Sequence, residues 1–368
     1  MRAILEDRIA GGYLLWGEEG IGKEALAIEF AKTVNCINPI IGENTIDSCD
    51  QCKSCKRFDD LSHPNFLYVF PLPAGKAGDN GADNPLSKLS EDQVEAVTEQ
   101  IALKAADPYY KIDIPGANQI KISQARHLKR TLSLSAPASG RRVALVSRAE
   151  ALTAEASNSF LKTLEEPHEK ITIILTTCNR NSIMQTILSR CQQIRCSPAP
   201  IAEVQRKLIE ETGAEPAAAR LAASFSQGAY AIAKSYSGEE LQSLRELAVV
   251  MLRNALTPKV YRNKLYTQIE EFTKDKNKQR TAKYLGILEM LLRDCYALNY
   301  GARRESIINT DMLPTVSKIA EAFPNADYSK AFDALDVAGK MLNANGAASL
   351  ILLSLLIKIR TIFLANKI

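Results

Sequence analysis

A glycine-bearing loop near the N-terminus constrains the fold of this 368-residue chain more than any other feature. It reads Gly17-Glu18-Glu19-Gly20-Ile21-Gly22-Lys23-Glu24 and fits the pattern G-x-x-x-x-G-K. The apolar run GYLLW precedes it, and a helical pattern of apolar residues follows it up to Val34. In a strand–loop–helix unit of this kind, backbone N–H groups surround phosphates and the lysine neutralises their charge. A glycine-rich turn with a chance lysine is the alternative. The phosphate-loop reading predicts a nucleotide site at Gly17, Gly20, Gly22, Lys23 and Glu24.

Further strand candidates alternate with helical patterns up to about Cys196. The segments HPNFLYVFP, RRVALVS and ITIILTT are apolar enough for strands, and the last has the continuous apolar character of a parallel sheet covered on both faces. Helical patterns occur in IKISQARHLKRTLSLS and in AEALTAEASNSFLKTLEEP, which we expect to stop at Pro167. Alternating strands and helices predict a doubly wound α/β domain over residues 1–196.

Two other regions differ from this pattern. Residues 71–118 scatter Gly, Pro, Asp and Asn between polar stretches, so we interpret them as a polar insertion that includes a mobile loop, with regular patterning resuming at Ile120. After Pro200 helical periodicity recurs to the end, so the second half is expected to be α-helical. A division near residue 240 is indicated by the break SYSGEELQS.

The nucleotide site lacks the residues that hydrolysis needs. Glu24 stands where a working phosphate loop has Ser or Thr, whose hydroxyl ligates Mg²⁺. The apolar strand Val143-Ala144-Leu145-Val146 runs into Ser147-Arg148 rather than into an acidic pair. Without those groups there is no second metal anchor and no base to orient water. We therefore expect that ATP or ADP can bind but that ATP is not hydrolysed.

Bulk properties bear on the cysteines. The net charge is only +4, the N-terminus does not read as a signal peptide, and the apolar stretch Ala347–Ile357 is about half of what crosses a bilayer. A cytoplasmic location without membrane contact is expected, where the eight cysteines would be thiols or metal ligands.

Four of these cysteines are closely spaced, as Cys36-x₁₂-Cys49-x₂-Cys52-x₂-Cys55. Tetrahedral Zn²⁺ needs four soft ligands that converge, and a tight loop can supply three of them while Cys36 completes the set. The favoured interpretation is a structural zinc insert at residues 36–55. An iron–sulfur cluster and free thiols remain the alternatives.

The combined motifs resemble a known family. The phosphate loop, the four-cysteine insert, the segment Asn158-Ser-Phe-Leu-Lys-Thr-Leu-Glu-Glu-Pro167 and the triplet Ser189-Arg190-Cys191 look like the bacterial clamp-loader AAA+ subunits. The resemblance implies an AAA+ parallel sheet flanked by helices, a helical lid at residues 197–240 and an α-helical collar for oligomerisation at residues 241–368.

The same resemblance assigns roles to two polar residues. Arg190 would be an arginine finger that stabilises charge on the nucleotide of a neighbouring subunit. The simpler alternative is a surface arginine that ends a short helix. Asn179, with Thr176 and Thr177, lies where the family keeps a sensor of the γ-phosphate, although ordinary polar residues at a strand end would read the same way.

The leading interpretation is an assembly subunit of the delta-prime type. It would join delta and gamma/tau subunits in a hetero-pentamer that loads a sliding clamp onto primed DNA in replication by DNA polymerase III. One alternative is a gamma/tau-type ATPase, against which Glu24 and Ser147-Arg148 argue. Another is a zinc-stabilised nucleic-acid-binding regulator with an inactive phosphate loop. The basic segment Lys274–Arg280 is interpreted as a solvated face or turn rather than a DNA groove.

Overall fold

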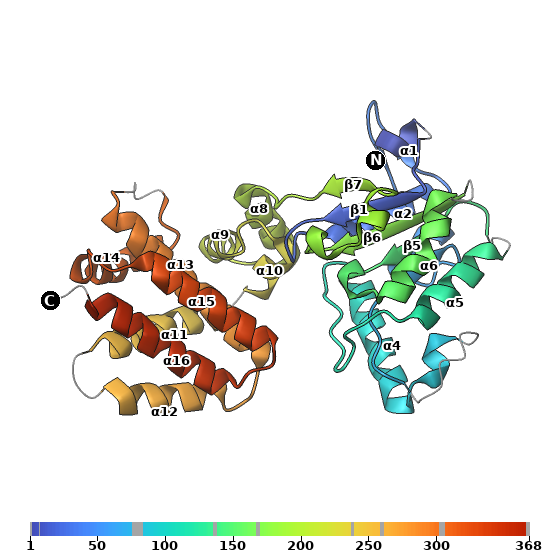
Figure 1. Cartoon of the computed structure of the whole chain (residues 1–368). Coiled ribbons are helices and arrows are strands. Elements are labelled where there is room, and N and C mark those ends of the chain that lie inside the picture. The colour runs from blue at the N-terminus through green and yellow to red at the C-terminus, as the bar shows by residue number, and fades with distance from the viewer. Residues whose placement is uncertain are drawn as a thin grey trace. The chain divides into compact units, whose positions relative to one another are not determined.

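The computed structural model describes residues 2–6, 8–75, 84–134, 138–166, 170–236, 239–257, 261–301 and 306–365. Contacts divide the chain into two compact units (Figure 1). The first comprises Met1–Ala199 with Ala229–Ile232, and the second comprises Pro200–Gly228 with Ala233–Ile368. Pro167, the expected helix stop, and residues 76–83 of the expected mobile loop lie outside the described residues.

Five parallel strands form the sheet of the first unit, in the order β4-β5-β6-β1-β7. The four strands predicted from apolar runs are confirmed as β1, β4, β5 and β6. The edge strand β7 was not predicted, because its sequence QQIR exposes all four side chains and so carries no apolar signal. The bounds are β1 Gly12–Trp16, β4 Phe66–Val69, β5 Arg142–Val146, β6 Ile171–Thr177 and β7 Gln192–Arg195.

Helices cover both faces of this sheet (Figure 1). Successive side chains of a strand point to opposite faces. Leu14 and Ile173 accordingly pack into one core with α5 and α6, while Leu15 and Ile174 pack into the other with α2 and α3. The doubly covered parallel sheet is therefore confirmed. The helices of this unit are α1 Arg2–Leu5, α2 Lys23–Val34, α3 Lys53–Asp59, α4 Glu91–Ala106, α5 Ile122–Ser133, α6 Ala154–Glu165 and α7 Gln185–Leu188, with short turns η1 Pro85–Lys88, η2 Ala149–Ala151 and η3 Arg180–Ser182.

The segment interpreted as a polar insertion, residues 71–118, contains the helix α4. The expectation that regular structure resumes only at Ile120 is therefore wrong. A capping box begins this helix: the Ser90 side chain accepts from the Gln93 N–H, and the Gln93 side chain accepts from the Ser90 N–H. A small core anchors the segment to the end of β4, and its buried members are Phe70, Val97, Ile114 and Ala117.

The second unit is helical, as predicted. In the described part of the chain after Pro200, every regular element is a helix. The boundary near residue 240 between a lid and a collar stays a prediction. The helices are α8 Ile201–Thr212, α9 Pro216–Phe225, α10 Tyr230–Ser235, which spans the two units, α11 Glu239–Leu256, α12 Tyr261–Thr273, α13 Lys278–Asn299, the turn η5 Thr310–Met312, α14 Leu313–Ala322, α15 Tyr328–Asn343 and α16 Ala348–Ala365.

The C-terminal helix α16 is longer than the apolar stretch Ala347–Ile357 suggested, because it continues through Lys358 and Arg360 to Ala365. By length and composition alone its 18 residues could cross a membrane. This is weak evidence for a span, since the core helix of a water-soluble protein passes the same test. Its buried side chains, among them Leu352 and Leu356, fit a helix packed on α11, α12 and α15.

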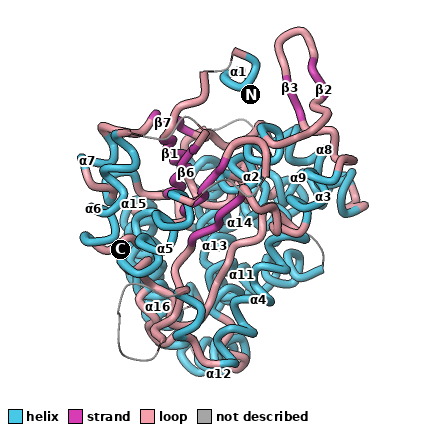
Figure 2. The backbone as a smooth tube through the Cα atoms, turned by 90° about the vertical axis from the view of Figure 1, so that its right-hand side faces the viewer, coloured by secondary structure: helices cyan, strands magenta, loops and turns pink. Residues whose placement is uncertain are grey.

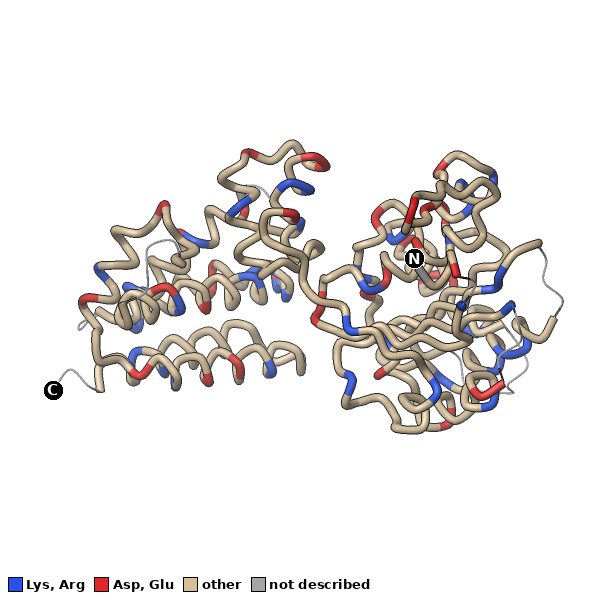
Figure 3. The backbone as a smooth tube through the Cα atoms, turned by 90° about the horizontal axis from the view of Figure 1, so that it is seen from above, with Lys and Arg blue, Asp and Glu red and all other residues tan. Residues whose placement is uncertain are grey.

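Charged residues of both signs are interspersed along the backbone (Figure 3), in keeping with the net charge of +4. The basic segment Lys274–Arg280 lies at the turn between α12 and α13. Arg280 pairs with Asp275 at 3.2 Å, and its guanidinium lies 4.9 Å from the ring centre of Phe272. These local contacts fit the predicted turn.

A buried arginine ties three parts of the second unit together. Arg245 of α11 is 2% exposed, and it donates to Asn309 Oδ1 at 3.0 and 3.1 Å and to Asp311 at 2.6 and 2.9 Å. Asp294 of α13 in turn accepts from the Asn309 N–H at 2.9 Å and from its Nδ2 at 2.7 Å. The segment around Asn309 is thus fixed to both helices by charge-assisted hydrogen bonds.

We expect Arg245→Leu to lower the free energy of unfolding by about 2–3 kcal/mol, because buried Asn309 Oδ1 loses both donors while the half-exposed Asp311 can turn to water. Urea denaturation followed by circular dichroism measures this change. Arg253→Leu, on an exposed face of the same helix, is the control and should change stability by less than about 0.5 kcal/mol. Equal effects of the two variants would contradict the role given to Arg245.

Candidate functional site

The glycine loop joins β1 to α2 at the carboxyl end of the sheet, where parallel α/β folds bind ligands. Gly20 and Gly22 have φ values of 77° and 90°, which side chains other than glycine rarely adopt. Gly22 is also the N-cap residue of α2. The predicted strand, loop and helix are therefore in place, and nucleotide contacts by these glycines remain a prediction.

Lys23 points back onto its own loop. Its side chain is 7% exposed, and Nζ donates to the carbonyl oxygens of Gly17 at 2.9 Å and Glu18 at 2.5 Å. Nζ also lies 3.4 Å from Sγ of Cys178, at the end of β6. An ammonium that serves phosphates in a working loop is here bonded to backbone carbonyls.

Glu24 is the centre of a network that sequence spacing did not reveal. Its carboxylate accepts from Lys104 Nζ at 2.6 Å, from Tyr68 Oη at 2.9 Å and from Ser147 Oγ. Burial alone would raise the pKa of Glu24, but the Lys104 ammonium and the two hydroxyls outweigh it and lower the pKa. Burial and the Glu24 charge raise the pKa of Tyr68 well above its usual value. Glu24 is thus held ionised.

The two positions that would anchor a metal ion therefore bind each other. Glu24 stands in place of the loop hydroxyl, and Ser147 stands where acidic residues usually end the strand. The hydrogen bond between them joins α2 to the end of β5. At this strand end Ser147 and Arg148 offer no carboxylate that could orient water.

Aromatic and aliphatic side chains lie against the glycines of the loop. A Cβ built on Gly22 would lie 2.7 Å from Cε1 of Tyr109, and one built on Gly20 would lie 2.7 Å from Cγ1 of Ile232. The rings of Tyr109 and Tyr230 meet edge to face at 4.7 Å. The N–H of Ala231 donates to the Gly20 carbonyl at 3.0 Å. The loop is thus packed against residues from two distant parts of the chain.

The predicted sensor residue Asn179 caps a short turn. Its Oδ1 accepts from the N–H of Asn181 at 3.2 Å, and its own N–H donates to Thr177 Oγ1 at 3.0 Å. Thr176 and Thr177 are buried, with 2% and 1% of their surface exposed. The residue of this strand end that contacts Lys23 is Cys178. A sensor role for Asn179 stays a prediction.

Arg190, the predicted finger, lies at the surface of the first unit with 29% of its side chain exposed. Its guanidinium pairs with Glu165, the last residue of α6, through Nε at 2.9 Å and through Nη2. Nη1 donates to the Thr186 carbonyl at 2.9 Å. Glu165 belongs to the segment ending at Pro167 that carried the family resemblance, and Thr186 lies four residues before Arg190. They hold the guanidinium at the protein surface rather than inside the core.

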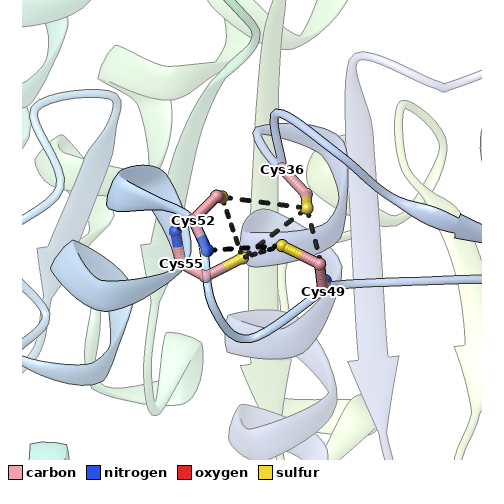
Figure 4. A group of neighbouring side chains, drawn as sticks. All are labelled: Cys36, Cys49, Cys52 and Cys55. Carbon is pink, nitrogen blue, oxygen red and sulfur yellow. Dashed lines mark hydrogen bonds between the residues drawn. The ribbon is translucent and has the colours of Figure 1, made fainter.

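The four cysteines converge as their spacing predicted (Figure 4). Their sulfur atoms all lie within 4.8 Å of one another. Four of the six separations are 4.0 Å for Cys36–Cys52, 3.9 Å for Cys49–Cys55, 3.5 Å for Cys52–Cys55 and 3.6 Å for Cys36–Cys55. A tetrahedral ion with bonds of about 2.3 Å to sulfur would set its ligands about 3.8 Å apart. The cluster therefore fits a single metal ion.

Local backbone geometry favours the thiolate form of Cys49 and Cys52, whereas burial raises the pKa of the Cys36 and Cys55 thiols. The N–H groups of Cys49, Cys52 and Cys55 donate to the sulfurs of Cys36, Cys49 and Cys52 at 3.3, 3.4 and 3.4 Å. Burial opposes ionisation of Cys52, but the N–H donors of Cys55 and Ile37 lower the pKa of its thiol to about 6. Thiolates are the form that binds metals.

The long gap between Cys36 and Cys49 forms a hairpin of two short strands, β2 Ile40–Ile41 and β3 Ile46–Asp47, which stands out at the top of Figure 2. Cys36 follows the end of α2, and Cys52 is the N-cap residue of α3. The metal-binding cluster thus joins the phosphate-loop helix to the next element of the chain.

Sequence reasoning missed Tyr68, Lys104 and Tyr109. They lie 44, 80 and 85 positions after Glu24, as their numbers give, and no local spacing connects them to it. One signal was available: the S-x-x-Q capping box at Ser90 announces the helix that carries Lys104.

Comparisons with known proteins agree with the motifs. Residues 1–200 match the family model described as "DNA polymerase III, delta subunit", and residues 251–361 match that described as "DNA polymerase III, delta subunit, C terminal". DNA polymerase III subunit delta' of Bacillus subtilis is 25% identical over 344 residues, which cover 93% of this chain and 88% of the relative. The delta' subunit of Pseudomonas aeruginosa is 28% identical over 52% of this chain and 44% of its own length.

A related subunit is also similar to this chain. DNA polymerase III subunit tau of Escherichia coli is 26% identical over 242 residues, which cover 64% of this chain and 30% of the relative. The first family model matches 200 of the 368 residues, more than half of the chain. The chain therefore belongs to the DNA polymerase III delta-subunit family.

Proposed function

We propose that this chain is the delta-prime subunit of a bacterial DNA polymerase III clamp loader and helps to place the sliding clamp on primed DNA during replication. The alignment with a delta' subunit over 93% of this chain supports this function most directly. The aligned residues cover both the α/β unit and the helical unit. In the proposed subunit the first would contact neighbouring subunits and the second would serve for assembly.

The chemistry of the loop favours an assembly role over a motor role. A gamma/tau-type ATPase needs a hydroxyl and a strand-end acid to hold Mg²⁺. Here Glu24 and Ser147 occupy those positions and are bonded to each other. This contact counts against the alternative of a gamma/tau-type motor, and the family membership counts against a free nucleic-acid-binding regulator.

Arg190 supplies the proposed contribution to catalysis, in the nucleotide site of a neighbouring subunit. Its position at the surface and its planar guanidinium suit contact with phosphate oxygens. Glu165 and the Thr186 carbonyl orient it before the neighbour arrives. A guanidinium that stabilises transferring phosphate can be worth about 10³ to 10⁵ in rate.

The four-cysteine cluster is proposed to hold structural Zn²⁺. Four of the six sulfur separations lie between 3.5 and 4.0 Å and all lie within 4.8 Å, which suits one tetrahedral ion, whereas an iron–sulfur cluster would hold its thiolates farther apart. With four cysteine ligands no coordination position is left for substrate, so the ion would stabilise the fold and take no part in a reaction.

The proposed partners are delta and gamma/tau subunits in a hetero-pentamer, with contact to the clamp and to DNA made through the complex. The relatives carry the names of such subunits. The helices from α11 to α16 would form the oligomerisation collar, and a cytoplasmic location follows from this role.

The purified chain alone should hydrolyse ATP no faster than its Lys23→Ala variant, because the metal-holding residues are replaced. Phosphate release at saturating Mg²⁺ and ATP measures this. Turnover that depends on Lys23 would reject the non-catalytic site and favour the motor alternative.

Arg190→Ala should leave the chain folded but lower the ATPase of the reconstituted loader. Turnover at the one site that Arg190 serves should fall by about 10³ or more, so the total rate should lose that site's share. Arg126→Ala, an exposed arginine on α5 of the same unit, is the control. An unchanged rate for Arg190→Ala in an intact complex would exclude the finger role.

Elemental analysis should find about one zinc per chain, and the Cys52→Ser/Cys55→Ser variant should lose it together with stability, because metal binding contributes to folding. Cys178→Ser/Cys196→Ser removes the same number of thiols outside the cluster and should keep the metal. Iron in place of zinc, or no metal in freshly purified protein, would refute the zinc assignment.

A further inference from the structure

The cation beside Glu24 comes from the chain itself. Glu24 takes the position whose side chain ligates Mg²⁺ in a working phosphate loop. Lys104 Nζ lies 2.6 Å from this carboxylate, the separation of a direct ion pair. A positive group therefore already stands next to the place where the metal ion would be held.

Lys104 is held in this position by burial and by a second hydrogen bond. It lies in the last turn of α4, its side chain is 2% exposed, and Nζ donates a second hydrogen bond, of 2.7 Å, to the Tyr110 carbonyl. A lysine is almost never buried to this extent unless it is paired. Losing the carboxylate would leave an uncompensated charge in the interior, which favours keeping the pair closed.

The residues after α4 cover the loop from the same side. The Tyr109 ring lies against Gly22, at the point where α2 begins. Lys111, two residues further, pairs with Glu19 of the loop at the surface. The segment 104–111 thus contacts the loop at Glu19, Gly22 and Glu24.

We propose that segment 104–111 is an internal lock on the nucleotide site, in which Lys104 replaces the metal ion and Tyr109 covers the phosphate-binding turn. Mg²⁺ and the Lys104 ammonium cannot share the Glu24 carboxylate, because like charges at this distance repel strongly. Phosphates need the N–H groups at the start of α2, and the Tyr109 ring stands over this turn. Nucleotide therefore binds only to molecules in which the segment has moved away.

The lock rests on the proposed function of an assembly subunit, because it explains how the phosphate loop of such a subunit keeps its conformation without nucleotide. The partner-facing Arg190 belongs to a different contact set, with Glu165 and Thr186. A test on the isolated chain involves no partner, so its failure would leave the arginine-finger result untouched.

The first experiment compares nucleotide affinity of the wild-type chain with that of Glu24→Ser/Lys104→Met/Tyr109→Ala. This variant restores the metal-binding hydroxyl, removes the internal cation without leaving an unpaired charge, and removes the ring. Titration with a fluorescent ATP analogue in the presence of Mg²⁺ should show at least roughly tenfold tighter binding by the variant, because apparent affinity falls with the fraction of molecules that are open.

Two controls test whether the effect belongs to the lock. Lys129→Met removes an exposed lysine of α5, outside the segment, and should bind as the wild type does. The variant with Tyr109→Phe in place of Tyr109→Ala keeps the ring and should bind less tightly than the fully opened variant. Equal affinity of the wild type and the opened variant, or an equal gain from Lys129→Met, would overturn the proposal.

A second measurement needs no variant. When the native chain is treated with an amine-acetylating reagent, peptide mass spectrometry should find Lys104 at least roughly tenfold slower to react than exposed Lys111, since only open molecules expose it. Equal reactivity of Lys104 and Lys111 would overturn the lock even if the opened variant failed to fold.

Discussion

A carboxylate that is largely removed from water needs a counter-charge, and the structure around the phosphate loop provides one for Glu24, whose side chain is 22% exposed. Glu24 opens α2 at a position where a hydroxyl would be neutral and small. Its charge is balanced by Lys104 and satisfied by Tyr68 and Ser147, which come from α4, β4 and the end of β5. Glu24, which stands where a working loop has a hydroxyl, thus joins α2 by hydrogen bonds to α4, to β4 and to the end of β5. The pair is a consequence of burial as much as a source of stability.

The chain has the fold of a phosphate-loop protein, but Glu24 and Ser147 stand in place of the side chains that hold a metal ion in such a loop. The parallel sheet, the left-handed glycines and the helix that begins after Gly22 are present. The groups that would hold a metal ion are bonded to each other instead. The proposed function rests on other parts of the chain: Arg190 held by Glu165, the cysteine cluster that joins α2 to α3, and the helical second unit. A subunit that serves a neighbour's nucleotide has use for all three, and none of them requires hydrolysis in its own loop.

Much of the fold could be predicted because its signals are local. The runs GYLLW, RVALV and ITIILTT are continuous and apolar, as strands buried on both faces must be. The cysteine spacing and the G-x-x-x-x-G-K pattern are local too. The strand β7 and the helix α4 were missed, since β7 has no buried side chain and α4 buries only Val97 and Lys104.

The network at Glu24 could not have been foreseen from spacing, because its members come together only when the strand order is known. Polar partners that lie far apart in sequence leave no periodic signal. The same holds for Glu165 and Arg190, 25 positions apart, whose pairing follows from the end of α6 meeting the turn after α7.

The claim that the loop is kept as scaffolding is tested most directly at the backbone N–H groups of residues 17–24, which would bind phosphate in a working site. Hydrogen–deuterium exchange of the isolated chain, with and without ATP and Mg²⁺, reports on them individually. If the loop serves as scaffolding, these N–H groups should exchange slowly without nucleotide and gain no further protection when nucleotide is added. Strong protection of these groups by ATP and Mg²⁺ would contradict it.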